Sequence, residues 1–235
     1  MEKDRGARVI AIVALLIAVV GLSVGFAVMS STLTISSTAE VKPNENDFTV
    51  QFSTNSSTIT GEGPTVVGTT SSTAVTASTA TIANGTKSST LSGIHATFTE
   101  PGQSATYTFY AVNGGKYTAY LNSIAFGKAS GATGNEFKVC TKGTDTTEET
   151  VNGGTGITGA CDGISLKLSV GSLSNLDDSS SGLGDISSHS LAPLGETGNG
   201  ETVTVVITYA ANAARADGDF TVAFGDITMT YGAVD

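Results

Sequence analysis

The sequence has few of the residues that enzyme active sites use most often. Only two of its 235 residues are histidines, His95 and His189, and an HExxH zinc motif is absent. His95 lies in a predicted strand, where we expect a structural role, and His189 lies in a polar stretch, where we expect it to be solvated. No pattern in the sequence indicates a Ser-His-Asp triad. We therefore expect a protein that is not an enzyme.

Basic residues are also scarce. The chain has 11 Lys and Arg against 21 Asp and Glu, so its formal net charge is −10 at pH 7. Such a surface repels nucleic acid and anionic lipid, so a nucleic-acid partner is not expected. Charged residues make up only 14% of the chain, and Gly, Ser and Thr occupy many of the remaining polar positions.

Long helical patterns are absent after residue 30. Short alternating segments, separated by Gly, Asn and Asp, take their place. This composition is typical of an extracellular all-β protein with many turns. The chain is long enough to bury a core of its own.

The chain has two cysteines, Cys140 and Cys161. An even number of cysteines in an exported protein favours a disulfide, with two buried thiols as the alternative. Closing the polar, Gly-rich loop between them would stabilise the fold by roughly 3 kcal/mol. Metal binding by this pair is not indicated, because neither a CxxC spacing nor a histidine cluster accompanies it.

The N-terminal segment contains an apolar run over residues 9–29 that carries no charge. The run is long for the apolar part of a signal peptide and just long enough to span a membrane. Three outcomes are compatible with it: cleavage after Ala27 or Ser30, retention as a membrane anchor, or cleavage near residues 6–7 as in type IV pilins. We assign residues 1–30 to a signal peptide or a membrane helix.

The next segment has one apolar face. The alternating pattern over residues 33–41 places four side chains on that face, with a serine as the one polar interruption. The four are Leu33, Ile35, Ala39 and Val41. Such a strand needs a partner for its apolar face and its free edge. The partner is either another strand of the same chain or a neighbouring molecule.

Alternating patterns predict further strands along the chain. These strands lie at residues 48–52, 105–112, 117–126, 136–140, 164–170, 201–210 and 219–231. The sequence Asn113-Gly114-Gly115 predicts a hairpin turn between two of them. In the last segment the apolar phase changes at Gly225-Asp226, which predicts a β-bulge. Residues 211–218 are expected to form one helical turn.

Residues 53–81 are unusual, because 16 of these 29 residues are Ser or Thr. An O-glycosylated stalk is one interpretation. The segment has a single proline, Pro64, and keeps β-branched residues at Val66, Val67 and Val75. We therefore favour short, polar edge strands joined by long loops.

Two weak motifs remain. Residues 154–159 fit GxGxxG, but we expect them neither to follow a strand nor to open a helix, so no dinucleotide cofactor is expected. The acidic segments at residues 175–185 and 217–219 carry enough oxygen ligands for Ca²⁺ to be considered, although neither has the EF-hand spacing. No other cofactor or metal is expected.

The segments GFAVMSSTLTISSTAEV, FTVQFS and TEPGQSATYTFYAVNGGKYTAYLNSI together resemble the camelysin/TasA-type secreted proteins, which carry SipW-type signal peptides. TVTVVITYA is similar to a later strand of such proteins. The resemblance implies a jelly-roll-like antiparallel β-sandwich. For the best-known members it also implies extracellular biofilm fibres, in which the N-terminal strand of one subunit enters the sheet of the next.

These observations lead to one principal hypothesis and two alternatives. The principal hypothesis is a secreted, cell-surface-associated fibre or matrix subunit that assembles head-to-tail with copies of itself through residues 32–41. Its transient partners would be signal peptidase and the membrane during export. The alternatives are a type IV pilin-like subunit that keeps the helix at residues 9–29, and a membrane-anchored extracellular binding module. In each case residues 31–235 are expected to form a single β-sandwich domain with a Ser/Thr-rich insert at residues 53–81.

N-terminal sequencing of the mature protein distinguishes these hypotheses. We expect a start near residues 28–31, because cleavage there frees the strand at residues 33–41 for pairing. A start near residues 7–9 would instead favour the pilin-like alternative. An intact N-terminus would favour the anchored binding module.

Overall fold

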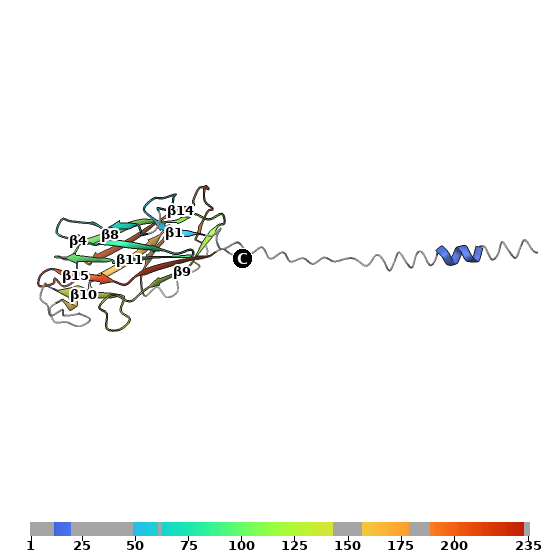
Figure 1. Cartoon of the computed structure of the whole chain (residues 1–235). Helices are drawn as coiled ribbons and strands as arrows, with labels where there is room; N and C mark the ends of the chain where they lie inside the picture. Colours follow the sequence, from blue (N-terminus) through green and yellow to red (C-terminus); the bar gives the residue numbers. More distant parts are fainter. Residues whose placement is uncertain (1–11, 20–48, 61–62, 143–156, 179–188, 233–235) are drawn as a thin grey trace, which may run out of the picture. The chain divides into compact units, whose positions relative to one another are not determined.

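The computed structural model describes residues 12–19, 49–60, 63–142, 157–178 and 189–232 (Figure 1). The chain divides into two units between Lys42 and Pro43. In the first unit, the described part is a short helix over residues 12–19. No helix among the described residues is long and apolar enough to cross a membrane. The strand predicted at residues 33–41 lies outside the described residues.

The second unit is built from antiparallel strands in two layers, which is a sandwich-like architecture. The first layer has the strand order β1-β8-β14-β11-β12, with β3 also alongside β8. Its strands are β1 (Val50–Ser53), β3 (Thr69–Thr70), β8 (Ser104–Asn113), β11 (Ile164–Val170), β12 (Leu173–Leu176) and β14 (Gly200–Tyr209).

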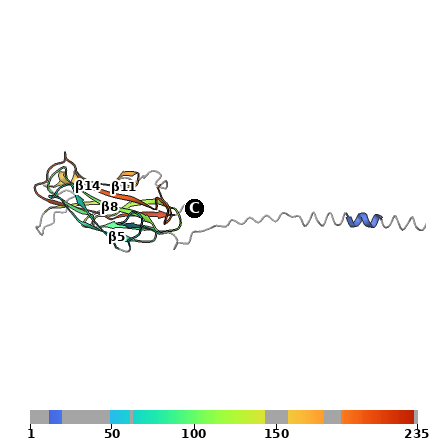
Figure 2. The ribbon, with the colours of Figure 1, turned by 90° about the horizontal axis from the view of Figure 1, so that it is seen from above.

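The second layer consists of two sheets, with strand orders β13-β9-β16-β6-β5-β2 and β10-β15-β7-β4. Seen from above, β5 of this layer lies below β8, β11 and β14 of the first layer (Figure 2). The strands of the first sheet are β2 (Thr65–Val67), β5 (Thr79–Asn84), β6 (Ser88–Ser92), β9 (Ala119–Phe126), β13 (Ser190–Leu191) and β16 (Ile227–Gly232). Those of the second are β4 (Thr76–Ala77), β7 (His95–Phe98), β10 (Lys138–Lys142) and β15 (Phe220–Phe224).

The core forms where the apolar faces of the two layers meet. Alternation along β14 buries Val203, Val205, Ile207 and Tyr209, as the pattern predicted. Its neighbour β8 buries an equivalent set. Each large side chain removed from water contributes about 1.5–3 kcal/mol, so these two strands supply much of the stabilisation.

Buried tyrosines connect the layers through their hydroxyl groups. The Tyr107 hydroxyl on β8 donates to the carbonyl oxygen of His95 on β7 at 2.9 Å and lies 2.7 Å from Ser78 Oγ. The Tyr209 ring packs edge-on against the Phe220 ring, with centroids 5.3 Å apart. The Tyr107 hydrogen bonds satisfy the polar end of a large core residue, which would otherwise carry a desolvation cost.

The phase change at Gly225-Asp226 is confirmed, but the predicted β-bulge is wrong, because β15 and β16 are separate strands in different sheets. Phe224 ends β15 and Ile227 begins β16, and both side chains are buried although they lie three residues apart. The Gly225 amide donates to the Phe137 carbonyl at 2.8 Å, so hydrogen bonding continues across the break. A Cβ atom at Gly225 would overlap the Gly127 carbonyl. Glycine is therefore required by the close approach of two backbones.

The hairpin predicted at residues 113–115 is wrong. β8 pairs in the first layer and β9 in the second, so the intervening turn passes between layers. The side-chain Nδ2 of Asn113 donates to the carbonyl oxygens of Tyr117 at 2.7 Å and Ala192 at 3.0 Å. Its side-chain Oδ1 accepts from the backbone amide of Gly115. The helical turn predicted at residues 211–218 is also wrong, since the segment is a turn and an irregular loop.

The Ser/Thr-rich segment holds short edge strands, as favoured from its composition. β2 and β4 lie at the edges of their sheets, and β3 pairs with one end of β8. The Gly68 amide donates to the Ser78 carbonyl where the chain passes from β2 to β3. The segment thus covers one side of the sandwich.

Replacing Gly225 by alanine should lower the free energy of unfolding by about 1–3 kcal/mol, because the new methyl group overlaps backbone that cannot move aside cheaply. Urea unfolding followed by circular dichroism measures the change. The control is Ala223→Ser on the outward face of β15, which should shift stability by no more than about 0.5 kcal/mol. Equal stability of Gly225→Ala and the wild type would contradict this account of the close backbone approach at Gly225.

Candidate functional site

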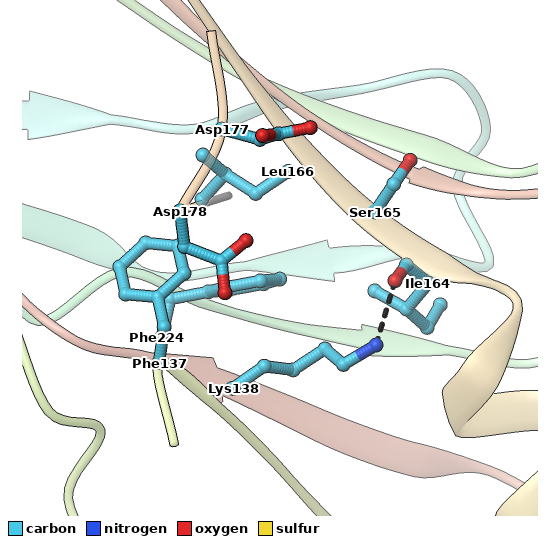
Figure 3. Close-up of a pocket in the computed structure, with 8 residues that line it drawn as sticks. All are labelled: Phe137, Lys138, Ile164, Ser165, Leu166, Asp177, Asp178 and Phe224. Carbon is cyan, nitrogen blue, oxygen red and sulfur yellow. Dashed lines mark hydrogen bonds between the residues drawn. The ribbon is translucent and has the colours of Figure 1, made fainter. Parts of the chain in front are cut away.

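A pocket lies between the Phe137–Lys138 segment, β11 and the residues that follow β12 (Figure 3). Its volume is about 160 Å³, similar to a cavity that accommodates one benzene-sized group. The pocket is lined by Phe137, Lys138, Ile164, Ser165, Leu166, Asp177, Asp178 and Phe224. Aromatic and aliphatic side chains therefore combine with two carboxylates and one amine.

The Lys138 amine joins neighbouring segments at this pocket. Its Nζ donates to the carbonyl oxygens of Cys161 and Ile164, each at 2.8 Å. Burial lowers the pKa of Lys138, and the charges of Asp162 and Asp178 partly offset this effect. The amine thus ties β10 to the helix α2 (Thr158–Asp162) and to the first residue of β11.

The disulfide predicted between Cys140 and Cys161 is confirmed. The two Cα atoms are 6.0 Å apart and both side chains are buried. The bond connects β10 to α2, the same two segments that Lys138 joins. A disulfide indicates an extracellular or otherwise oxidising environment.

Among the described residues, the pocket coincides with a gap along one edge of β11. All seven residues of β11 pair with β14 on one side. On the other side, β12 pairs at Leu168 and Val170, and Lys138 takes the carbonyl of Ile164. Leu166 lies between these two positions and lines the pocket. The edge is therefore covered at both ends and carries a recess in the middle, whose walls are half apolar and half polar or charged.

The edge of β1 is closed in a different way. The backbone amide of Phe52 donates to Oδ1 of the Asn84 side chain at 2.9 Å. The side-chain Nδ2 of Asn84 donates back to the Phe52 carbonyl, also at 2.9 Å. This pair of bonds reproduces the pattern that a neighbouring strand would make. Asn84 thus blocks strand addition at Phe52.

A second polar cluster lies at the start of β14. The Glu201 carboxylate accepts from the Tyr231 hydroxyl at 3.3 Å, and its Oε2 lies 4.0 Å from His189 Nδ1. His189 Nε2 lies 3.4 Å from Ser172 Oγ. The side chains of His189 and Glu201 are only 14% and 15% exposed. The expectation that His189 is solvated is therefore wrong, because tertiary contacts bury it between Ser172 and Glu201.

Burial has a strong effect on the Glu201 carboxyl group. It raises the pKa from 4.5 to about 7, and the hydrogen bond from Tyr231 only partly opposes this shift. The same burial, together with the negative charge of Glu201, raises the pKa of the Tyr231 phenol well above its ordinary value. Sequence reasoning missed this cluster, because its members lie on four separate segments.

The remaining candidate residues are placed as follows. The strand-donor residues Leu33, Ile35, Ala39 and Val41 lie outside the described part of the chain. Of the GxGxxG motif, Thr158 and Gly159 are described and lie in α2, so the expectation that the motif does not open a helix is wrong. This helix has only five residues and precedes β11. His95 pairs with Ala223 on β15, in line with a structural role.

The acidic segments considered for Ca²⁺ make other contacts. Asp177 pairs with Lys167, and Asp217 lies 3.7 Å from Lys142. Within the described ranges, no group of three or more His, Cys, Asp or Glu side chains is placed to hold a metal ion. The acidic segment at residues 175–185 is described only as far as Asp178.

These features define the class of the protein as a disulfide-bonded, antiparallel β protein of sandwich-like architecture. Comparison with protein-family models, with curated proteins and with solved structures finds no match. Its function must therefore be argued from its own residues.

The Glu201 pKa leads to a prediction about stability and pH. The unfolded chain loses this proton near pH 4.5 and the folded chain near pH 7. In that window the folded state binds more protons, so the free energy of unfolding should fall by about 3 kcal/mol as the pH rises. Urea unfolding at a series of pH values measures this slope.

The variant Glu201→Gln should remove that slope and should be more stable than the wild type above pH 7, since it keeps a hydrogen-bond acceptor without the charge. Its matched control is Glu100→Gln, which removes an exposed carboxylate paired with Arg215. The control should keep the slope. An unchanged slope in Glu201→Gln would show that another group is responsible.

Proposed function

We propose that the protein is a secreted or cell-surface fibre or matrix subunit that assembles by donating residues 32–41 to a neighbouring copy. The observation that carries this proposal is the gap along β11 at Leu166, where a pocket with apolar and charged walls lies beside a strand edge that the described residues pair incompletely. The expected jelly-roll-like sandwich and export by a signal peptide belong to the same proposal. The disulfide supports an extracellular location.

The proposed donor has the properties that strand addition requires. Its alternating pattern offers an apolar face, and its backbone offers a row of hydrogen-bond donors and acceptors. It belongs to the unit that ends at Lys42, whereas the sheets belong to the unit that begins at Pro43.

The proposed acceptor fits one apolar side chain of such a strand. A volume of about 160 Å³ suits a leucine or isoleucine, such as Leu33 or Ile35. The donor backbone would lie along β11 between the end of β12 and Lys138, where Leu166 is located. Asn84 already occupies the corresponding position on β1. The choice of β11 follows from this difference between the two edges.

A contact of this kind joins two different surfaces of the same chain. Each subunit then has one donor and one acceptor, so the contact repeats head-to-tail and produces a filament. Hydrogen bonds to the backbone of Leu166 would add to the affinity, and the pocket would select the register.

Deleting residues 32–41 from the mature protein should abolish polymers while the remaining domain stays folded, because the described core begins at Val50. Light scattering and electron microscopy measure assembly, and circular dichroism measures folding.

A peptide of residues 32–41 should slow polymer growth of the mature wild-type protein. Matched substitutions test the face: Ile35→Asp should block assembly and Thr34→Asp should not. Polymers formed by the deletion variant would rule out this function.

A further inference from the structure

The cluster at the start of β14 supports an activity that is independent of fibre assembly. Ser172, His189 and Glu201 lie in the order hydroxyl, imidazole and carboxylate, with both ring nitrogens facing a partner. This is the arrangement by which enzymes activate a serine nucleophile. We propose that Ser172, His189 and Glu201 form an acyl-transfer site that acts on carboxylic esters reached from solvent.

The distances place the three groups in the order that these roles require, although the His189–Glu201 contact is longer than a hydrogen bond. Ser172 Oγ lies 3.4 Å from His189 Nε2, and His189 Nδ1 lies 4.0 Å from Glu201 Oε2. Contacts between catalytic groups are often longer without substrate and tighten when substrate is bound. The two nitrogens of one imidazole therefore face the groups that a general base requires, with the nucleophile on one side and the orienting acid on the other.

Each member of the site is held by a separate backbone contact. The Gly171 amide donates to the Thr202 carbonyl at 3.0 Å, which fixes the turn before Ser172 against β14. The His189 carbonyl accepts from the Leu121 amide of β9 at 2.9 Å. Glu201 lies in β14 itself and receives the Tyr231 hydroxyl from β16. The cluster is thus supported by both layers of the sandwich.

Gly171 adds a steric reason for this geometry. Its φ of 54° lies in the left-handed region that favours glycine. A Cβ atom built on Gly171 would overlap Glu201 Oε2. A larger residue at position 171 would therefore displace the carboxylate from His189.

Exposure differs between the members in the way that catalysis requires. Ser172 is exposed, so a substrate can reach its hydroxyl group. His189 and Glu201 are largely shielded from water, which strengthens the electrostatic coupling between them. The reacting atom therefore faces solvent, while the groups that activate it are protected.

The chemical step balances without a further reagent. Ser172 Oγ attacks the carbonyl carbon of the ester, and its proton passes to His189 Nε2. The bond between that carbon and the leaving alcohol oxygen breaks, and the alcohol takes the proton from His189. Water then hydrolyses the acyl-serine by the same proton route, which restores Ser172. Glu201 acts as a positioning residue that orients His189.

A fluorophosphonate probe tests the nucleophile on the full chain, with mass spectrometry to locate the adduct. We expect one adduct, on Ser172, that is lost in Ser172→Ala and kept in Ser174→Ala, an exposed serine on the same hairpin. His189→Gln should slow labelling by at least about 100-fold, the lower range for loss of a general base. Absence of the adduct, or an equal rate in His189→Gln, would overturn the proposal.

A second variant tests the same contact with His189 in place, so the result does not depend on whether His189→Gln folds. Ser172→Cys places a thiol beside His189, and this is the only free thiol in the chain because Cys140 and Cys161 are joined. Its alkylation by iodoacetamide should begin at lower pH than that of Ser174→Cys, since an adjacent imidazolium favours the thiolate. Identical pH profiles for the two thiols would also overturn the proposal. Neither measurement depends on whether the protein forms fibres.

Discussion

The antiparallel pairing of β8 with β14 is the interaction on which the rest of the structure depends. It extends from Ser104 opposite Thr208 to Val112 opposite Gly200. Because side chains alternate across a strand, this register directs the aromatic and β-branched residues of both strands into one core. A slip of one residue would expose that face and bury the threonines. The pairing also places Glu201 at the end of the sandwich where His189 and Ser172 meet it.

The hairpin of β11 and β12 carries both functional features. Near its open end, Leu166 lines the pocket that we propose as the acceptor for a donated strand. At its turn, Ser172 faces His189. β11 is held on one side by full pairing with β14, and its start is held by Lys138. The disulfide fixes α2, which immediately precedes β11. A strand held at both ends, with one position unpaired among the described residues, suits the strand addition that we propose.

The two layers are linked by polar groups as well as by apolar packing. Tyr107 reaches the carbonyl of His95, and Tyr231 reaches the carboxylate of Glu201. Such buried contacts specify the relative position of the layers, because any other arrangement would leave polar atoms without partners. The two contacts differ in whether the hydrogen-bond partner can ionise. The Tyr107 contact has no ionised partner, whereas the Tyr231 contact includes a carboxyl group whose pKa is about 7.

Local pattern predicted the long strands β8, β11 and β14 and their inward faces, because a period of two specifies which side of a strand is apolar. It also predicted the phase change at Gly225-Asp226 and the pairing of the only two cysteines. It did not predict β6 or β12, whose sequences are short and rich in polar residues. Pattern could not decide which strands pair. The turn at residues 113–115 has hairpin residues, yet Asn113 bonds to the β13 region and the chain passes to the other layer.

The burial of His189 and its approach to Ser172 and Glu201 also arose only from the tertiary structure. Those contacts join segments separated along the chain, and their geometry depends on strand order and register. The sequence by itself therefore determined the long strands and the faces that they bury. The tertiary structure decided which polar groups come together, since only packing brings distant segments within hydrogen-bond reach.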